Sequence, residues 1–252
     1  MIKQLPELVH FDYCNNCNIM LPMLGQDLKD GRRRSGLTQM EAAARLGVSQ
    51  PYLSQLERGR RPVTPKLART ATTLYRLPAT ALPMPETVKP GAPADPAKLA
   101  RQLAGLGYPA FEHLRSGPRA NPAVVVLEAL LQPDLDFRVS EALPWVLLNY
   151  PQLDWQWLVD HAKRHDVQNR LGFVVAVARA VAARHPGFSG AEGWLAAAEQ
   201  QLERSRLARE DTLGRDSMPA AERRWLAENR SPAARHWNML TSLSGEQLTY
   251  AA

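Results

Sequence analysis

Residues 37–59 carry the feature that most limits the fold of this chain, two short helix patterns joined by a glycine-centred turn. Thr38 is a suitable N-cap for the first helix and Ser49 for the second. Gly47 and Gly59 each follow the last apolar residue of a helix, where a positive φ favours glycine. Apolar residues recur at helical spacing in both segments, at Met40, Ala43 and Leu46 and then at Leu53 and Leu56. The pattern predicts a helix-turn-helix.

Two further helices are expected around this pair. A basic amphipathic stretch with Leu24 and Leu28 precedes it and ends at Ser35–Gly36. A helix from about Pro65 to Tyr75 follows it, with its inward residues at Leu67, Ala71 and Leu74. The spacing therefore predicts a compact helical unit over residues 23–77, preceded by an N-terminal extension over 1–22.

The positive charge of the chain is concentrated in this unit. The whole chain has a net charge of +6 and a pI of about 9.6. Residues 21–78 hold 11 Lys or Arg against 4 Asp or Glu, whereas residues 79–252 hold 19 of each. Such a segment is typical of proteins that bind a polyanion, most often nucleic acid. The alternative is a basic face that contacts only solvent.

The second helix of the pair has a polar face that suits the major groove of DNA. Its polar residues are Gln50, Tyr52, Ser54 and Gln55, beside Arg58. Gln can pair with adenine through two hydrogen bonds, Ser can bond either kind of base edge, and Tyr can contact a phosphate or a thymine methyl group.

The pattern resembles the Cro and lambda-repressor type of helix-turn-helix, the XRE family, over about 55 residues. The resemblance rests on Gly25–Leu28, Arg32, Gly36–Gln39, Ala43, Leu46–Ser49 and Tyr52–Gly59. It implies a five-helix unit that binds double-stranded DNA as a homodimer. It implies that Gln39 holds a phosphate, that Arg32 and Glu57 form a structural ion pair, and that further DNA contacts come from Ser49, Gln50, Tyr52, Ser54, Gln55, Arg58, Arg60 and Arg61.

Three residues depart from the family pattern. Pro51 stands early in the second helix, where the first-turn N–H groups lack helical partners and proline is tolerated. Ala42 replaces a larger aliphatic residue, so a thinner core is expected there. Gly31 within the first helix is expected to cost about 1 kcal/mol relative to alanine.

Prolines divide the chain after this unit. They cluster at positions 78, 83, 85, 90, 93 and 96, and proline disrupts helix interiors, so residues 78–95 are predicted to form an extended linker. Residues 96–252 contain all six Trp and several helix start signals. Helices are expected to begin at Pro96, after Asn121, after Asp154 and at Gln168, and to cover Glu192–Leu213, Ala220–Asn229 and Pro232–Leu243, with Pro144 kinking or ending another.

The predicted fold class is therefore all-α. It consists of a lambda-repressor-like helix-turn-helix domain, a Pro-rich linker, and a C-terminal bundle or irregular array of helix pairs. The C-terminal part, 96–252, is expected to serve regulation, dimerisation or partner binding. The stretch 105–183 resembles the helical C-terminal region of some bacterial XRE regulators, which implies a link to toxin–antitoxin or phage-defence operons.

No cofactor, metal or catalytic site is predicted. Cys14 and Cys17, with His10 as a third ligand, have the spacing of half a zinc site, and a complete site needs four ligands. His161 and His165 lie one helical turn apart beside Lys163 and Arg164, which indicates an exposed basic helix face. Asp134 and Asp136 are expected to be solvated loop residues. No phosphate loop, nucleophile elbow or dinucleotide motif occurs.

Three hypotheses about function follow. The first is a dimeric, sequence-specific repressor of its own operon, located in the cytoplasm because neither a signal peptide nor a membrane span is predicted. The second is an antitoxin whose C-terminal part neutralises a toxin while the N-terminal part represses the operon. The third is an enzyme targeted to DNA, but no residues at catalytic spacing support this hypothesis.

Overall fold

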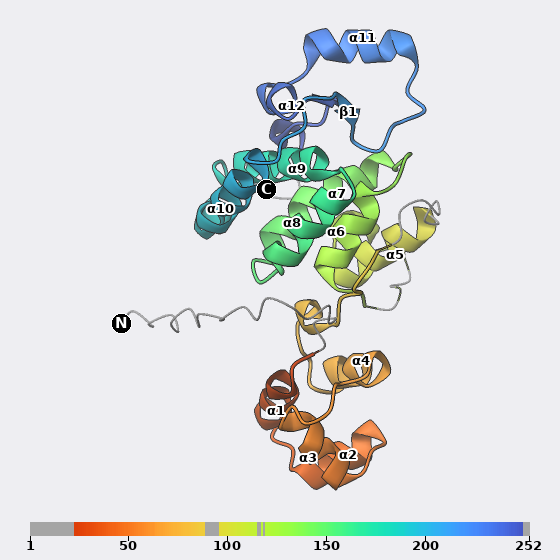
Figure 1. Cartoon of the computed structure of the whole chain (residues 1–252), viewed down its shortest axis with the longest axis vertical. Helices are drawn as coiled ribbons and strands as arrows, with labels where there is room; N and C mark the ends of the chain where they lie inside the picture. The colour runs from red at the N-terminus through yellow and green to blue at the C-terminus, as the bar shows by residue number, and fades with distance from the viewer. Residues whose placement is uncertain (1–22, 89–95, 115–116, 118, 249–252) are drawn as a thin grey trace.

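The computed structural model describes residues 23–88, 96–114, 117 and 119–248. Within these residues the fold is mostly helical, as predicted, and forms two lobes (Figure 1). The N-terminal lobe lies at the bottom of Figure 1 and the larger C-terminal lobe above it. The N-terminal lobe contains four helices in the described residues, namely α1 Gly25–Arg34, α2 Gln39–Leu46, α3 Gln50–Glu57 and α4 Pro65–Leu74.

The predicted helix boundaries in this lobe are confirmed. Thr38 caps α2 reciprocally with Glu41, since its hydroxyl accepts from the Glu41 amide at 3.2 Å and its own amide donates to Glu41 Oε2 at 2.8 Å. Gly47 and Gly59 both have φ of +69°, which allows the chain to turn sharply after α2 and after α3. These local signals fix the angle at which α3 leaves α2.

Two glycines in α1 bring the helix close to its neighbours. A Cβ at Gly25 would lie 2.1 Å from the carbonyl oxygen of Leu56, so α1 meets α3 backbone to backbone. A Cβ at Gly31 would lie 2.8 Å from a side-chain carbon of Leu77 and 3.1 Å from the ring of Tyr75. Glycine at position 31 lowers the helix propensity of α1, but it allows the core to close against the chain that follows α4.

Met40 is a correction to the predicted core, because its side chain is 74% exposed. The inward residues of α2 are Ala42, Ala43 and Leu46, and Met40 lies about 100° around the helix from their centre. Ala42 is fully buried. Leu74 is only partly buried, whereas Leu67 and Ala71 are inside as predicted.

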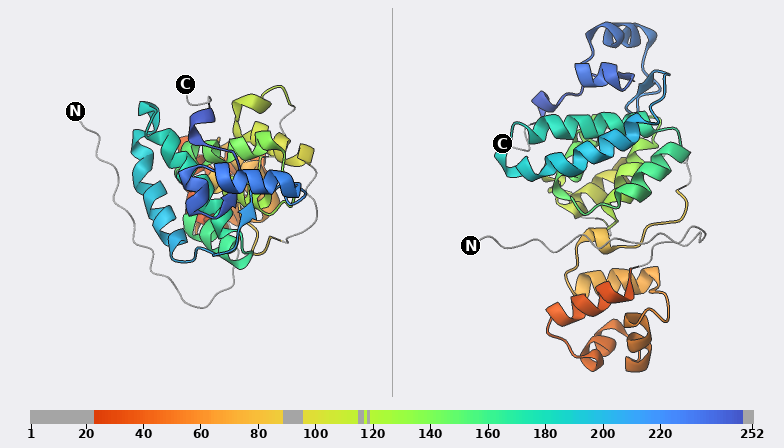
Figure 2. Two further views of the ribbon diagram at one scale, coloured as in Figure 1. Left: turned by 90° about the horizontal axis from the view of Figure 1, so that it is seen from above. Right: turned by 60° about the vertical axis from the view of Figure 1, so that its left-hand side comes forward.

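The C-terminal lobe is built around α9 (Figure 2). Helix α9 packs against α7, α8 and α10, and its residues from Leu171 to Ala178 are almost entirely buried. The elements of this lobe are α5 Pro96–Leu106, α6 Pro122–Leu130, α7 Phe137–Asn149, α8 Trp155–Arg164, α9 Gln168–Ala182, α10 Glu192–Glu203, β1 Asp211–Thr212, α11 Ala220–Asn229, α12 Pro232–His236 and β2 Met239–Leu240, with short 3-10 turns at Pro109–Phe111, Pro186–Ala191 and Gly245–Gln247.

Three helices end differently from the sequence prediction. Helix α7 runs through Pro144 to Asn149, so the helix does not end at this proline. Helix α10 stops at Glu203 and α12 at His236, and the chain after each contributes a two-residue strand to a parallel pair that the sequence did not reveal.

Side chains from α9 explain why α10 ends early. Gln168 Nε2 donates to the carbonyl of Ser205 at 3.1 Å. Asn169 donates to the carbonyl of Leu207 and accepts from its amide, both at 2.8 Å. These bonds satisfy backbone groups that a continuing helix would have paired internally.

Trp237 joins the end of the chain to α9. Its side chain is fully buried, and a Cβ at Gly172 would lie 2.4 Å from the indole ring. The indole therefore lies directly on the backbone of α9. Asn238 follows with φ of +54°, which stops α12 and turns the chain into β2.

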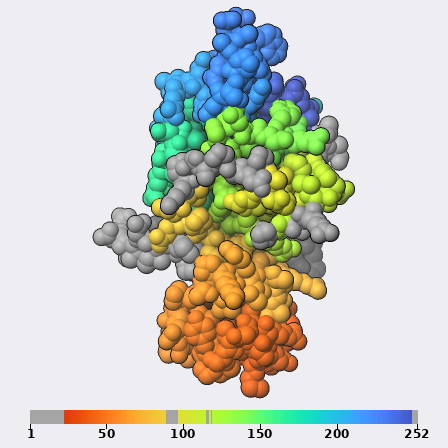
Figure 3. All heavy atoms as spheres, turned by 90° about the vertical axis from the view of Figure 1, so that its right-hand side faces the viewer, coloured from red at the N-terminus to blue at the C-terminus, as the bar shows by residue number. Residues whose placement is uncertain are grey.

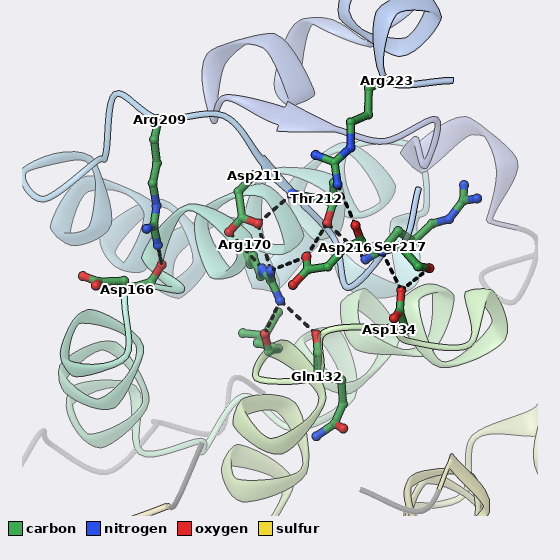
Figure 4. A network of polar contacts seen from close by, with 12 residues as sticks. Gln132, Asp134, Asp166, Arg170, Arg209, Asp211, Thr212, Asp216, Ser217 and Arg223 are labelled. Carbon is green, nitrogen blue, oxygen red and sulfur yellow. Dashed lines mark hydrogen bonds and ion pairs between the residues drawn. The ribbon is translucent and has the colours of Figure 1, made fainter. Parts of the chain in front are cut away.

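Arg170 ties four segments of this lobe together (Figure 4). Its guanidinium donates to both carboxylate oxygens of Asp211 at 2.9 and 2.8 Å, to Asp216 at 3.3 Å, and to the carbonyls of Leu130 and Gln132 at 2.9 and 3.0 Å. All five N–H groups thus have partners. We conclude that this network is structural.

Asp134 and Asp136 are exposed residues between α6 and α7, as predicted, and each also accepts a hydrogen bond from a backbone amide. Asp134 accepts from the hydroxyl and amide of Ser217 at 2.6 and 3.1 Å, which lowers the pKa of its carboxyl group (Figure 4). Asp136 caps α7 by accepting from the amide of Arg138 at 2.8 Å. Both carboxylates therefore fix the chain on either side of Leu135.

The proline-rich segment is packed more closely than an extended linker, as far as residue 88. Ala79–Ala81 forms a 3-10 turn, and Leu82 and Met84 belong to the core of the C-terminal lobe. Residues 89–95 lie outside the described residues. The domain boundaries at 22, 77 and 95 stay predictions.

His161 is a second correction, because the predicted exposed basic face holds a buried histidine. Its ring stacks on Trp157 with 4.1 Å between centroids. Its Nδ1 lies 2.8 Å from the carbonyl of Trp157 and its Nε2 lies 3.1 Å from the carbonyl of Glu86. This histidine helps to hold the proline-rich segment against α8.

No helix of the described residues combines the length and apolar character needed to cross a membrane.

Candidate nucleic-acid interface

Helix α3 is fixed by its buried side. Leu53 and Leu56 are fully buried, and Pro51 occupies the first turn without loss of a helical hydrogen bond. The Ser49 hydroxyl accepts from the amide of Tyr52 at 3.4 Å and so caps the helix. This bond gives Ser49 a structural role beside its predicted contact with DNA.

The opposite side of α3 presents its polar residues. Gln50, Ser54 and Gln55 are half-buried and Arg58 is exposed. Among the described residues, no hydrogen bond to another side chain occupies the polar groups of Ser54, Gln55 or Arg58. These groups are therefore available to a ligand that lies along the helix.

A continuous chain of hydrogen bonds runs from the lobe's core to this face. Arg32 donates to both carboxylate oxygens of Glu57 at 2.6 and 3.0 Å, which is the ion pair implied by the family resemblance. Gln39 Nε2 donates to Glu57 Oε2 at 2.8 Å, and Gln50 Nε2 donates to Gln39 Oε1 at 2.7 Å. Glu57 therefore orients Gln39, which in turn orients Gln50.

The Gln39–Gln50 bond was not predicted from the sequence. Both residues stand at the first position of their helices, directly after the caps Thr38 and Ser49. That shared position was the available signal, but the distance between the two helix starts depends on the turn at Gly47.

The charged state of Glu57 is held by its partners. Burial would raise the pKa of this carboxyl group, but hydrogen bonds from Arg32 and Gln39 and the charge of Arg32 outweigh it and leave the pKa below the ordinary value of 4.5. Glu57 is 5% exposed, so the pair is shielded from solvent. Glu57 is thus a positioning residue for the polar face, and it does not itself face a ligand.

Basic side chains extend the polar face beyond α3. The guanidinium of Arg61 lies 5.7 Å from the centroid of the Tyr52 ring, a cation–π arrangement that orients both side chains. Arg58, Arg60 and Arg61 are exposed, and the cationic groups of Arg58 and Arg60 have no carboxylate partner among the described residues. The end of α3 and the turn after it therefore form a positively charged rim.

Other predicted candidates are placed as follows. Within the described residues, no three His, Cys, Asp or Glu side chains form a group that could hold a metal ion. His10, Cys14 and Cys17 lie outside the described residues.

The N-terminal lobe, with its capped helix α3 and the basic rim that follows it, defines a helix-turn-helix DNA-binding protein. Residues 23–83 match a protein family described as a helix-turn-helix domain. An HTH-type transcriptional regulator, y4dJ of Sinorhizobium fredii (strain NBRC 101917 / NGR234), is 48% identical over 58 residues, which are 23% of this chain and 68% of that protein. No solved structure matches the chain.

The chain belongs to the family of helix-turn-helix transcriptional regulators, and its N-terminal lobe is of the XRE-like type. It is therefore a DNA-binding transcriptional regulator. The family match ends at residue 83, so the role of the C-terminal lobe is not part of this assignment.

Proposed function

We propose that the protein is a homodimeric repressor that binds an operator upstream of its own gene in the cytoplasm. The observation that carries this proposal is the bond chain from Glu57 through Gln39 to Gln50. It holds a base-reading side chain in place before DNA arrives, which reduces the side-chain entropy lost on binding. No catalytic step is part of the proposal.

Counting donors and acceptors supports a direct contact of Gln50 with adenine. Its amide uses one N–H in the bond to Gln39, and the second N–H and the carbonyl oxygen remain free. These two groups match N7 and the N6 amino group of adenine in the major groove. Gln39 likewise keeps one N–H, after its bond to Glu57, for a phosphate oxygen.

The remaining predicted residues divide into two classes. Tyr52, Ser54 and Gln55 would face bases or the adjacent backbone, whereas Ser49, Arg58, Arg60 and Arg61 would contact phosphates. Two copies of the lobe would place their α3 helices about 34 Å apart, one turn of DNA.

The test is binding of the purified full chain to the DNA upstream of its gene, measured by fluorescence anisotropy against a scrambled duplex of equal length. A preference of about 10³ or more, with affinity falling steeply as salt rises, would support a specific autoregulator. Equal binding to both duplexes at all salt concentrations would refute the proposed operator.

Two classes of variant separate base readout from phosphate contact. Gln50→Ala is expected to lose about 1–3 kcal/mol on the operator and little on the scrambled duplex. Arg60→Ala is expected to weaken both duplexes alike and to reduce the salt dependence. Arg164→Ala, an exposed cation in α8, is the matched control. If Gln50→Ala, like Arg60→Ala, weakened binding to both duplexes equally, this docking of α3 would be contradicted.

A second candidate is an antitoxin whose C-terminal lobe also neutralises a partner protein. Trp225 favours it, because this side chain on α11 is 57% exposed, and exposed large apolar groups often mark interaction sites. Co-expression with the product of the neighbouring gene tests it. Growth rescue that the Trp225→Ala variant loses would support the antitoxin, whereas toxicity unchanged by the wild-type chain would refute it.

A further inference from the structure

A cavity of about 400 Å³ lies where the two lobes meet. Helix α4 borders it from the N-terminal lobe, with Arg69. The segment after the 3-10 turn borders it with Leu82 and Met84, and the C-terminal lobe with Gln102, Arg119 and Val124. Figure 3 shows the N-terminal lobe, in orange and red, at one end of the molecule. Anything bound in the cavity therefore contacts both lobes.

The apolar wall of the cavity is held in a fixed shape. Leu82 and Met84 are 5% and 6% exposed and belong to the core of the C-terminal lobe. Asn121 donates to the carbonyls of Thr80 and Leu82 at 3.1 and 2.7 Å. It also caps α6 by accepting from the amide of Ala123 at 3.0 Å. The segment is thus fastened to the start of α6, and the cavity is a built feature.

Gln102 supplies a buried hydrogen-bond acceptor that has no donor. Its side chain lines the cavity, the residue is 8% exposed, and its Oε1 has no hydrogen-bond partner within the described part of the chain. A buried acceptor without a donor is unfavourable, and native structures rarely leave one unexplained. Because Oε1 itself is enclosed by protein atoms, a ligand hydroxyl or N–H group would satisfy it once the amide rotates toward the cavity.

The charge of the lining indicates the rest of the ligand. Arg69 and Arg119 both line the cavity and are exposed, and neither forms an ion pair with a described carboxylate. None of the lining residues is Asp or Glu. Because guanidinium groups bind carboxylates and phosphates through charge-assisted hydrogen bonds, the lining favours an anion.

We propose that this cavity binds a small organic anion with an apolar body and a hydroxyl or N–H donor. Its body packs against Leu82, Met84 and Val124, its anionic group pairs with Arg69 and Arg119, and its donor meets Gln102. The occupant fixes the N-terminal lobe relative to the C-terminal lobe and so changes operator affinity. This last step rests on the proposed function, whereas the binding site itself does not.

Calorimetric titration of the full chain with three probes of similar size tests the site without DNA. Indole-3-acetate carries the anion, the N–H donor and the apolar body. Indole-3-acetamide lacks the charge, and 1-naphthaleneacetate lacks the donor. The expected dissociation constant for indole-3-acetate is about 1 mM or tighter, with each of the others at least about tenfold weaker. No binding of indole-3-acetate, or equal binding of all three, overturns the proposal.

Variants locate the binding in this cavity. Arg69→Gln removes one cation at an exposed position, and Gln102→Leu replaces the unpartnered amide with an apolar group of similar size. Each is expected to weaken indole-3-acetate about tenfold, whereas Arg164→Gln, away from the cavity, leaves it unchanged. Val124→Phe fills the cavity and should abolish binding. Circular dichroism verifies that each variant is folded. If Val124→Phe does not fold, Arg69→Gln still tests the site, because Arg69 lies at the surface. Unchanged binding to folded Arg69→Gln and Gln102→Leu overturns the site.

The regulatory step has a separate readout. Operator affinity is measured by anisotropy with and without saturating indole-3-acetate. A change of about fivefold or more, absent in Arg69→Gln, supports the coupling. Binding of the probe with no change in operator affinity overturns the coupling and leaves the site. Failure to bind the operator both with and without the probe refutes the proposed function instead.

Discussion

Replacing Arg32 with methionine should unfold the N-terminal lobe while leaving the C-terminal lobe intact. Methionine keeps an apolar stem but removes the guanidinium that makes two hydrogen bonds to Glu57 and a third, at 2.8 Å, to the carbonyl of Leu37. The variant therefore leaves a buried carboxylate without its cation. It also leaves Gln39 as the principal remaining partner of Glu57.

The expected cost is about 3–5 kcal/mol, the range found when one partner of a buried ion pair is removed. A lobe of this size has a total stability of the same order. The double variant Arg32→Met/Glu57→Met should recover most of the loss, because no uncompensated charge then remains. Urea denaturation of the three proteins gives the free energies.

The position of the tryptophans makes the assay specific. All six Trp lie after residue 140, so fluorescence excited selectively at Trp reports the C-terminal lobe alone. Circular dichroism reports both lobes. In Arg32→Met the dichroism transition should gain a component at lower urea while the Trp transition stays in place. A parallel shift of both would show that the lobes unfold together and would refute the local reasoning.

The effect should also depend on pH. In the wild type the Glu57 pKa is below 4.5, so its stabilising contribution is present above that pH and is lost as the pH falls through the lower folded value. Without Arg32, burial raises the Glu57 pKa, and stability is lost as the pH rises through that raised value. The difference in unfolding free energy between wild type and Arg32→Met should therefore shrink from pH 7 to pH 4. A constant difference would contradict the assignment to Glu57.

Three further outcomes are expected. Gly25→Ala should destabilise the N-terminal lobe strongly, because the added Cβ would lie 2.1 Å from the carbonyl oxygen of Leu56. Thermal melting followed by circular dichroism measures this, and a melting curve identical to that of the wild type would contradict the contact. Arg170→Met should lower the stability of the C-terminal lobe by about 3–5 kcal/mol, seen in the Trp fluorescence transition, since Asp211 loses its cation. Met40→Gln should change the free energy of unfolding, measured by urea denaturation, by less than about 0.5 kcal/mol, because the side chain is 74% exposed.

Some features of the fold depended on residues close together in sequence and were predictable. The caps Thr38 and Ser49 and the left-handed glycines at 47 and 59 act within four residues of the helix ends they define. The N-terminal lobe and the polar face of α3 followed from these signals and from the apolar spacing. The helix that ends at Asn229 was predicted with its full range for the same reason.

Other features depended on contacts between distant residues. Glu57, Gln39 and Gln50 meet only because the turn at Gly47 brings two helix starts together. The side chain of Asn169 takes up the backbone of Leu207 and so ends the helix pattern that the sequence carried to Leu213.

The sequence by itself determined that this chain forms a helix-turn-helix with a polar, basic outward face, because capping, turn conformation and helical periodicity are local properties. Only the tertiary structure decided which polar groups are already occupied, that His161 is buried, and that residues 82–85 line a cavity together with Gln102. Burial and hydrogen-bond satisfaction depend on which distant segments pack together, and the spacing of residues along the chain does not specify that packing.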